Sequence, residues 1–100
     1  MLFIGYAEDA PETDEKRAAL RDEHVAYLRA KPDAVVLGGA LSDGNGARLG
    51  TCLIVSAPDF TAAQAWFAAE PYNKAGLFKS LRVTRVSRGV WNPDLAADTK

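Results

Sequence analysis

The chain has 100 residues, of which 48% are hydrophobic and 25% are charged, and its formal net charge is −1. This length fits one domain, and the near-neutral charge lacks the basic face that nucleic-acid binding usually requires. The longest apolar run, from Leu2 to Tyr6, is far shorter than the roughly 20 residues of a membrane-spanning helix. We therefore expect neither nucleic acid nor a membrane among the partners.

The first two predicted elements are a strand and a long helix. Residues 2–7 are apolar or small on both sides of the alternation, which indicates a strand. A helix is predicted from Thr13 or Asp14 to about Ala30, with acidic residues in its first turn. Pro32 ends it, because the residue before a proline is pushed out of helical geometry. One stripe of this helix faces a core: Leu20, His24, Tyr27 and Leu28.

A β-hairpin is predicted next. Residues 34–41 and 49–56 are apolar runs, and the turn-forming segment 42–46 separates them. Gly38 and Gly39 lie inside the first of these strands, where glycine often marks a bulge or the close approach of a ligand.

The second helix has a predicted start and a predicted end. Thr61 and Gln64 have the spacing of a capping box, so the helix is expected from Ala62 to Ala69 or Glu70. Pro71 ends it. Residues 72–76 are expected to add one helical turn closed by a glycine.

The last predicted strand covers residues 77–91. Leu81 and Val86 are in opposite phases of the alternation, which predicts a bulge near Thr84–Arg85 or a bend. Residues 92–100 form a polar, alanine-rich tail, so residues 1–91 are expected to be the single domain.

This order of elements, β-α-β-β-α-β, predicts a ferredoxin-like α+β fold. Right-handed crossovers place both helices on one face of a four-stranded antiparallel sheet. The chain has nothing left to cover the other face, although the strands are apolar on both sides. Contiguous apolar surfaces of this size are rare on soluble monomers. We therefore predict a homodimer that packs sheet to sheet.

His24 is the single histidine and the first candidate for chemistry. Its imidazole titrates near neutral pH and suits a general acid or base. Arg21 lies one turn earlier, where it could hold an anionic group of a substrate. The alternative is a partly buried histidine whose ring only satisfies a backbone carbonyl.

Glu70 is the second candidate, because a carboxylate beside Pro71 can point into a cavity and pair with His24. The alternative is an ordinary surface acid, disfavoured by the negative end of a helix. Tyr6 and Tyr72 are interpreted as pocket or core residues, and Gly38–Gly39 would leave room for a ligand. Asp9 is expected to be solvated.

The remaining residues argue against a metal or cofactor site. One histidine and one cysteine supply no ligand cluster, and no glycine-rich phosphate loop is present. Cys52 is expected to be a small buried hydrophobe. The N-terminus lacks the basic residues and cleavage site of a secretory signal, so a cytoplasmic location is predicted.

Four blocks, in this order, resemble the YciI-like family over nearly the whole chain up to Trp91. The blocks are Met1–Ala7, the helix segment Arg17 to Leu28, Val36–Leu41, and Ala63–Trp66 followed by Glu70–Leu77. No single block is as specific as a nucleotide-binding loop, but their order makes the combination strong.

The resemblance implies a dimeric α+β barrel. It also implies a site built from a helix histidine and an acid before proline, which correspond here to His24 and Glu70. The family commonly has aspartate at the second position, so this chain differs there by one methylene. One branch of the family resembles dehalogenases and isomerases that act on small muconolactone-type rings without a cofactor.

Two hypotheses about function follow. The first is an acid–base enzyme of lyase, isomerase or dehalogenase type that acts on a small carboxylated or lactone-type molecule. It would use His24 and Glu70 for proton transfer and Arg21, Tyr6, Gly38, Gly39 and Tyr72 for binding. The second is a dimer that binds a small ligand, or serves as an accessory protein, without catalysis.

Overall fold

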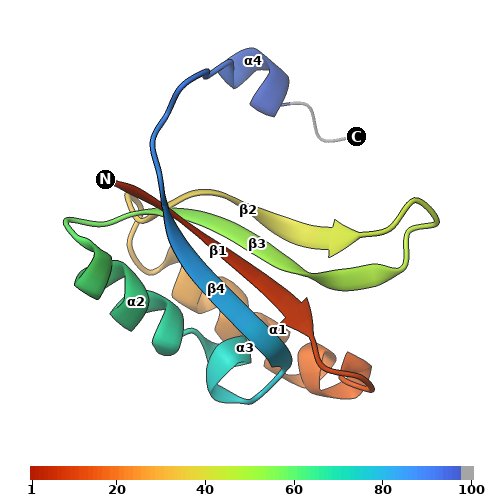
Figure 1. Ribbon diagram of the computed structural model, residues 1–100. Coiled ribbons are helices and arrows are strands. Elements are labelled where there is room, and N and C mark those ends of the chain that lie inside the picture. Colours follow the sequence, from red (N-terminus) through yellow and green to blue (C-terminus); the bar gives the residue numbers. More distant parts are fainter. Residues whose placement is uncertain (98–100) are drawn as a thin grey trace.

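The computed structural model describes residues 1–97, which form a four-stranded antiparallel sheet with helices beneath one face (Figure 1). The elements, in chain order, are β1 (Leu2–Asp9), α1 (Asp14–Arg29), β2 (Val35–Ser42), β3 (Arg48–Ser56), α2 (Phe60–Ala68), α3 (Pro71–Lys74), β4 (Phe78–Val86) and α4 (Pro93–Ala96). No helix among the described residues is long and apolar enough to cross a membrane.

The sheet has the strand order β2-β3-β1-β4, with every neighbouring pair antiparallel. β3 and β1 are the central strands, and each helical crossover leads from a central strand to an edge strand: α1 connects β1 to β2, and α2 with α3 connects β3 to β4. This arrangement confirms the predicted ferredoxin-like α+β fold with its two main helices on one face (Figure 1).

The core lies between the sheet and the helices. Alternate residues of β1 and β3, among them Phe3 and Val55, are almost fully buried against α2. Phe67 of α2 lies directly over Gly5 of β1, where a Cβ atom would come within 2.3 Å of the ring. Glycine at this position therefore lets α2 approach the centre of the sheet closely.

The prediction for the start of α2 was wrong by two residues. Asp59, and not Thr61, is the N-cap, and its Oδ1 accepts a hydrogen bond of 2.8 Å from the backbone N–H of Ala62. Both residue types cap helices well. The earlier start brings Phe60 into the first turn, where its ring stacks on Phe3 with centroids 5.9 Å apart.

The prediction for the last strand was also wrong. β4 ends at Val86 rather than near Trp91, and its pairing with β1 is regular through Thr84 and Arg85. The register shifts at the other end of β4, beside Glu8 and Asp9. Val86 has the phase opposite to Leu81 because the two side chains lie on opposite faces of a regular strand.

The face of the sheet that no helix of residues 1–97 covers is largely apolar and is called the open face here. By strand register it carries Leu2, Ile4, Tyr6, Leu37, Cys52, Ile54 and Val86, together with the polar residues Arg82 and Thr84 of β4. Tyr6 and Leu37 are each about half exposed. Cys52 was predicted to be buried but is partly exposed, because its side of β3 lies away from the helices. Partial burial nevertheless raises the pKa of its thiol.

After β4 the chain leaves the sheet. Residues 87–92 form no helix or strand, and the short helix α4 stands clear of the sheet on the side opposite α1 and α2 (Figure 1). Asn92 caps α4 by accepting a hydrogen bond from the N–H of Leu95. Of the predicted tail, residues 98–100 lie outside the described residues.

Candidate functional site

Glu70 is placed by its backbone at the beginning of α3. α2 ends at Ala68, so Glu70 lies beyond it in an extended conformation, and Pro71 occupies the first position of α3. Glu70 Oε2 accepts a 3.2 Å hydrogen bond from the N–H of Asn73, which makes Glu70 the N-cap. A negative charge is favourable at this end of a helix. The expected penalty of a helix C-terminal position therefore does not apply.

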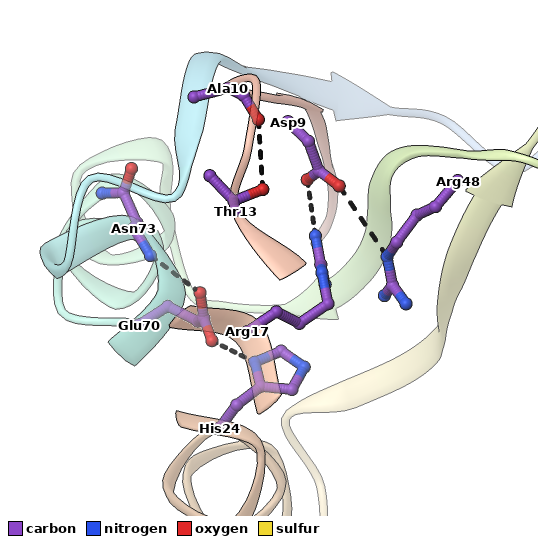
Figure 2. A network of polar contacts seen from close by, with 8 residues as sticks. All are labelled: Asp9, Ala10, Thr13, Arg17, His24, Arg48, Glu70 and Asn73. Carbon is purple, nitrogen blue, oxygen red and sulfur yellow. Dashed lines mark hydrogen bonds and ion pairs between the residues drawn. The ribbon is translucent and has the colours of Figure 1, made fainter. Parts of the chain in front are cut away.

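The other carboxylate oxygen of Glu70 contacts His24 across the interface between α3 and α1 (Figure 2). The residues are 46 positions apart in the chain, and Oε1 of Glu70 is bonded to Nδ1 of the imidazole. Glu70 is 2% exposed, and the His24 side chain is 12% exposed. A carboxylate at Nδ1 favours the tautomer with the proton on Nδ1, which leaves Nε2 as a proton acceptor.

Tyr72 fixes the orientation of the His24 ring. The two rings stack with centroids 3.9 Å apart and planes inclined by 10°. The guanidinium of Arg17 lies over the same Tyr72 ring at 4.9 Å from its centroid. Glu70, Tyr72 and Asn73 belong to α3 and its N-cap. This single turn therefore supplies both the Tyr72 ring that stacks on His24 and the Glu70 carboxylate that contacts Nδ1.

A second polar cluster lies beside the histidine, around Asp9 (Figure 2). Asp9 Oδ1 is 2.5 Å from Arg17 Nη2, and its Oδ2 is 3.8 Å from Arg48 Nε. The Asp9 side chain is only 13% exposed, so the expectation of a solvated carboxylate was wrong. It is largely buried because it is the last residue of β1 and pairs with Arg17 in the first turn of α1.

The two arginines differ in their surroundings. Arg17 is buried, and within the described residues its Nε and Nη1 atoms have no hydrogen-bond partner. Arg48 keeps 40% of its side chain exposed. Burial lowers the pKa of the Arg48 guanidinium, and the charge of Arg17 lowers it further, whereas Asp9 raises it. Two cations thus share one carboxylate.

A cavity of about 440 Å³ adjoins this cluster. Its lining is formed by Asp14, Arg17, Ala18, Arg21, His24 and Val25 of α1, together with Ala40, Arg48 and Tyr72. The volume lies in the range of small-molecule sites. Among residues 1–97, histidine, cysteine, aspartate and glutamate side chains form no group of three that could hold a metal ion.

Not every residue singled out in the sequence lies at this cavity. His24, Arg21 and Tyr72 line it, and Glu70 lies directly behind His24. Gly38 faces Leu53 on the helix side of β2, and Gly39 lies on the opposite face. Ala40 is the β2 residue that reaches the cavity.

Tyr6 lies in a neighbouring hollow of about 500 Å³, lined also by Asp9, Arg48 and Lys79. Sequence reasoning missed Arg48 altogether, because nothing in its local pattern distinguishes it from any other charged residue at the end of a turn. Arg17 did carry a signal, since it lies two helical turns before His24 on nearly the same face.

The chain is similar to known proteins over most of its length. The YCII-related domain matches residues 1–87. Protein YciI of Escherichia coli is 33% identical over 91 residues, which span 83% of this chain and 93% of that protein. A protein of Haemophilus influenzae is 32% identical over 91 residues, with the same two shares.

One solved structure resembles the chain over most of its length. It is 5-chloro-2-hydroxyhydroquinone dehydrochlorinase (TftG) from Burkholderia phenoliruptrix, in complex with 2,5-dihydroxybenzoquinone. The two structures superpose with a TM-score of 0.77 at 28% sequence identity, covering 89% of this chain and 96% of that one.

Proposed function

The chain belongs to the YCII-related domain family, and from this premise we propose that it is an acid–base enzyme in which His24 and Glu70 transfer a proton to or from a small cyclic substrate. The observation that carries the proposal is the contact of Glu70 with His24 Nδ1, at the wall of a cavity that His24 lines. The resemblance to a dehydrochlorinase supports an elimination of this kind.

The proposed reaction starts with neutral His24. Nε2 takes a proton from an O–H or C–H group of the substrate, and the electron pair of the broken bond forms a new π bond. A halide or carboxylate then leaves with the electron pair of its own bond to carbon. Glu70 stabilises the imidazolium that forms, because its carboxylate is already in contact with Nδ1. The imidazolium finally returns its proton to solvent or product.

The substrate class follows from the charges around the cavity. Arg21 lies exposed at the rim, and Arg48 shares the Asp9 carboxylate with Arg17. Arginine side chains suit carboxylate and phenolate oxygens, with which they can form paired hydrogen bonds. A carboxylated ring, a lactone or an ionised hydroxylated ring therefore fits the site, with Tyr72 forming part of its wall.

Glu70→Gln tests the proposal. Glutamine can still accept the hydrogen bond from the Asn73 N–H, so α3 keeps its cap, but the negative charge beside the imidazolium is lost. We expect kcat/KM to fall by about 10²-fold or more, with the melting temperature lowered by only a few degrees because the favourable charge at the N-terminus of α3 is also lost. The assays are halide release from chlorinated hydroxyhydroquinones and ring opening of small carboxylated lactones.

Glu23→Gln is the matched control, because Glu23 lies exposed on α1 and its replacement removes the same charge. We expect its activity to equal that of the unmodified protein. If the protein binds these compounds, as judged by shifts of the His24 ring resonances, yet turns none of them over, it is a binding protein and the proposed catalysis is wrong.

We also propose that two copies associate through the open face, and its uncovered apolar residues support this proposal. Sedimentation velocity should give a mass of about twice 10.7 kDa at micromolar concentration. Ile54→Glu places a charge in the middle of this face and should produce monomers. Thr61→Glu, on the exposed side of α2, should leave the mass unchanged. A monomeric unmodified protein would refute the association.

A further inference from the structure

The chain continues beyond the sheet in a segment called the arm here, residues 87–97. It leaves the end of β4 and carries α4 away from the sheet, on the side of the open face (Figure 1). A hollow of about 520 Å³ lies where the arm leaves the sheet. Residues of the sheet and of the arm line this hollow together: Leu2, Val36, Leu37, Ile54 and Val86 with Ser87 to Trp91.

The apolar side chains of the arm are exposed. Val90 is 94% exposed, Leu95 is 72% exposed and Trp91 is 48% exposed. Single exposed apolar residues are ordinary, but three large ones within six positions, next to an uncovered apolar face, are a typical feature of an interaction surface. Trp in particular is enriched among residues that contribute most to binding.

The arm also lies outside the part of the chain that the family shares. The YCII-related domain matches residues 1–87, and the arm begins where that match ends. The packing of the domain core therefore does not account for these apolar residues. A partner that covers them has to reach the side of the sheet from which the arm projects.

A second copy is the partner that the dimensions favour. Four strands about 4.8 Å apart, with about eight residues rising 3.3 Å each, give the open face an area of roughly 500 Å². A stable interface usually buries about 800 Å² per partner. The flat area of the open face thus provides a small interface, and an added apolar segment enlarges the surface that a second copy can bury.

We propose that the arm of each copy packs against the sheet of a second copy, so that two arms are exchanged across the dimer. The reach is sufficient, because the six residues 87–92 extend over about 20 Å, which is the width of a four-stranded sheet. Val90, Trp91 and Leu95 become buried against the partner. The inference rests on the dimer proposed above.

The test uses the full chain with Val90→Ser, Trp91→Ser and Leu95→Ser combined. Loss of these apolar contacts should raise the dimer dissociation constant at least tenfold, as measured by sedimentation velocity. Arg88→Ser with Asp94→Ser is the matched control, since it changes the same segment without removing apolar contacts. We expect its dissociation constant to match that of the unmodified protein.

A second measurement follows Trp91 directly. In a Trp66→Phe background Trp91 is the single tryptophan, and its emission should move to shorter wavelength as the concentration rises through the dissociation constant. An unchanged dissociation constant in the triple variant overturns the exchange of arms while leaving the dimer through the open face intact. Blue-shifted emission in the dilute monomer also overturns it, because the arm would then cover its own sheet.

Discussion

His24→Ala is expected to lower kcat/KM by 10²- to 10⁴-fold, the usual contribution of a positioned acid or base. The cavity and its arginines remain, so substrate binding should change much less than the rate. The same change leaves the Glu70 carboxylate buried without its partner. We therefore expect the free energy of unfolding to fall by about 1–3 kcal/mol, which denaturant unfolding measures alongside the activity.

Two further experiments separate proton transfer from a purely structural effect. His24→Gln retains an amide that can donate to Glu70 but removes the base, so stability should recover while activity stays low. Added imidazole should restore part of the rate in His24→Ala, because the deleted ring leaves a space beside Glu70. Full activity in His24→Ala would remove the histidine from the mechanism.

Gly50→Ala is expected to have the largest effect on stability. A Cβ atom at Gly50 would lie 1.8 Å from the carbonyl oxygen of Ala7 and 3.1 Å from the Cα of Glu8. These are backbone atoms of β1 and cannot rotate away as a side-chain end could. The two central strands β1 and β3 would have to separate at the end of their pairing, where Gly50 lies opposite Glu8, at a cost of about 3 kcal/mol or more.

The control for this prediction is Gly44→Ala, in the turn after β2. No atom of residues 1–97 lies within 4 Å of a Cβ atom built there, and Gly44 does not have a positive φ angle. Its free energy of unfolding should stay within about 0.5 kcal/mol of the unmodified value. Equal stability of the Gly50 and Gly44 variants in urea unfolding would contradict the close approach of β1 and β3.

The elements themselves were largely predictable because their signals are local. Alternation identified the strands, helical spacing identified α1, and Pro71 followed by a glycine-closed turn identified α3. The two errors have the same origin. Asp59 and Thr61 are both good caps, and Val86 fits a strand on either face, so local chemistry alone could not choose between the alternatives.

The candidate site was predictable only in part. His24 was predicted to face inward from its place in the helical stripe, and Glu70 from its place before a proline. What no local pattern showed is that α3 begins at Glu70, which turns an unfavourable helix end into a cap. Asp9 and Arg48 lie in connecting segments or at strand ends, where side-chain direction depends on the neighbouring elements.

The sequence by itself determined the order of elements, the fold class and an apolar sheet with one face uncovered, since hydrophobic spacing and turn chemistry act over a few residues. Only the tertiary structure decided which charges meet. The crossover through α2 brings Glu70 to His24, and the β2–β3 hairpin brings Arg48 beside Asp9. Such contacts depend on strand register and helix packing, which are set by the whole chain at once.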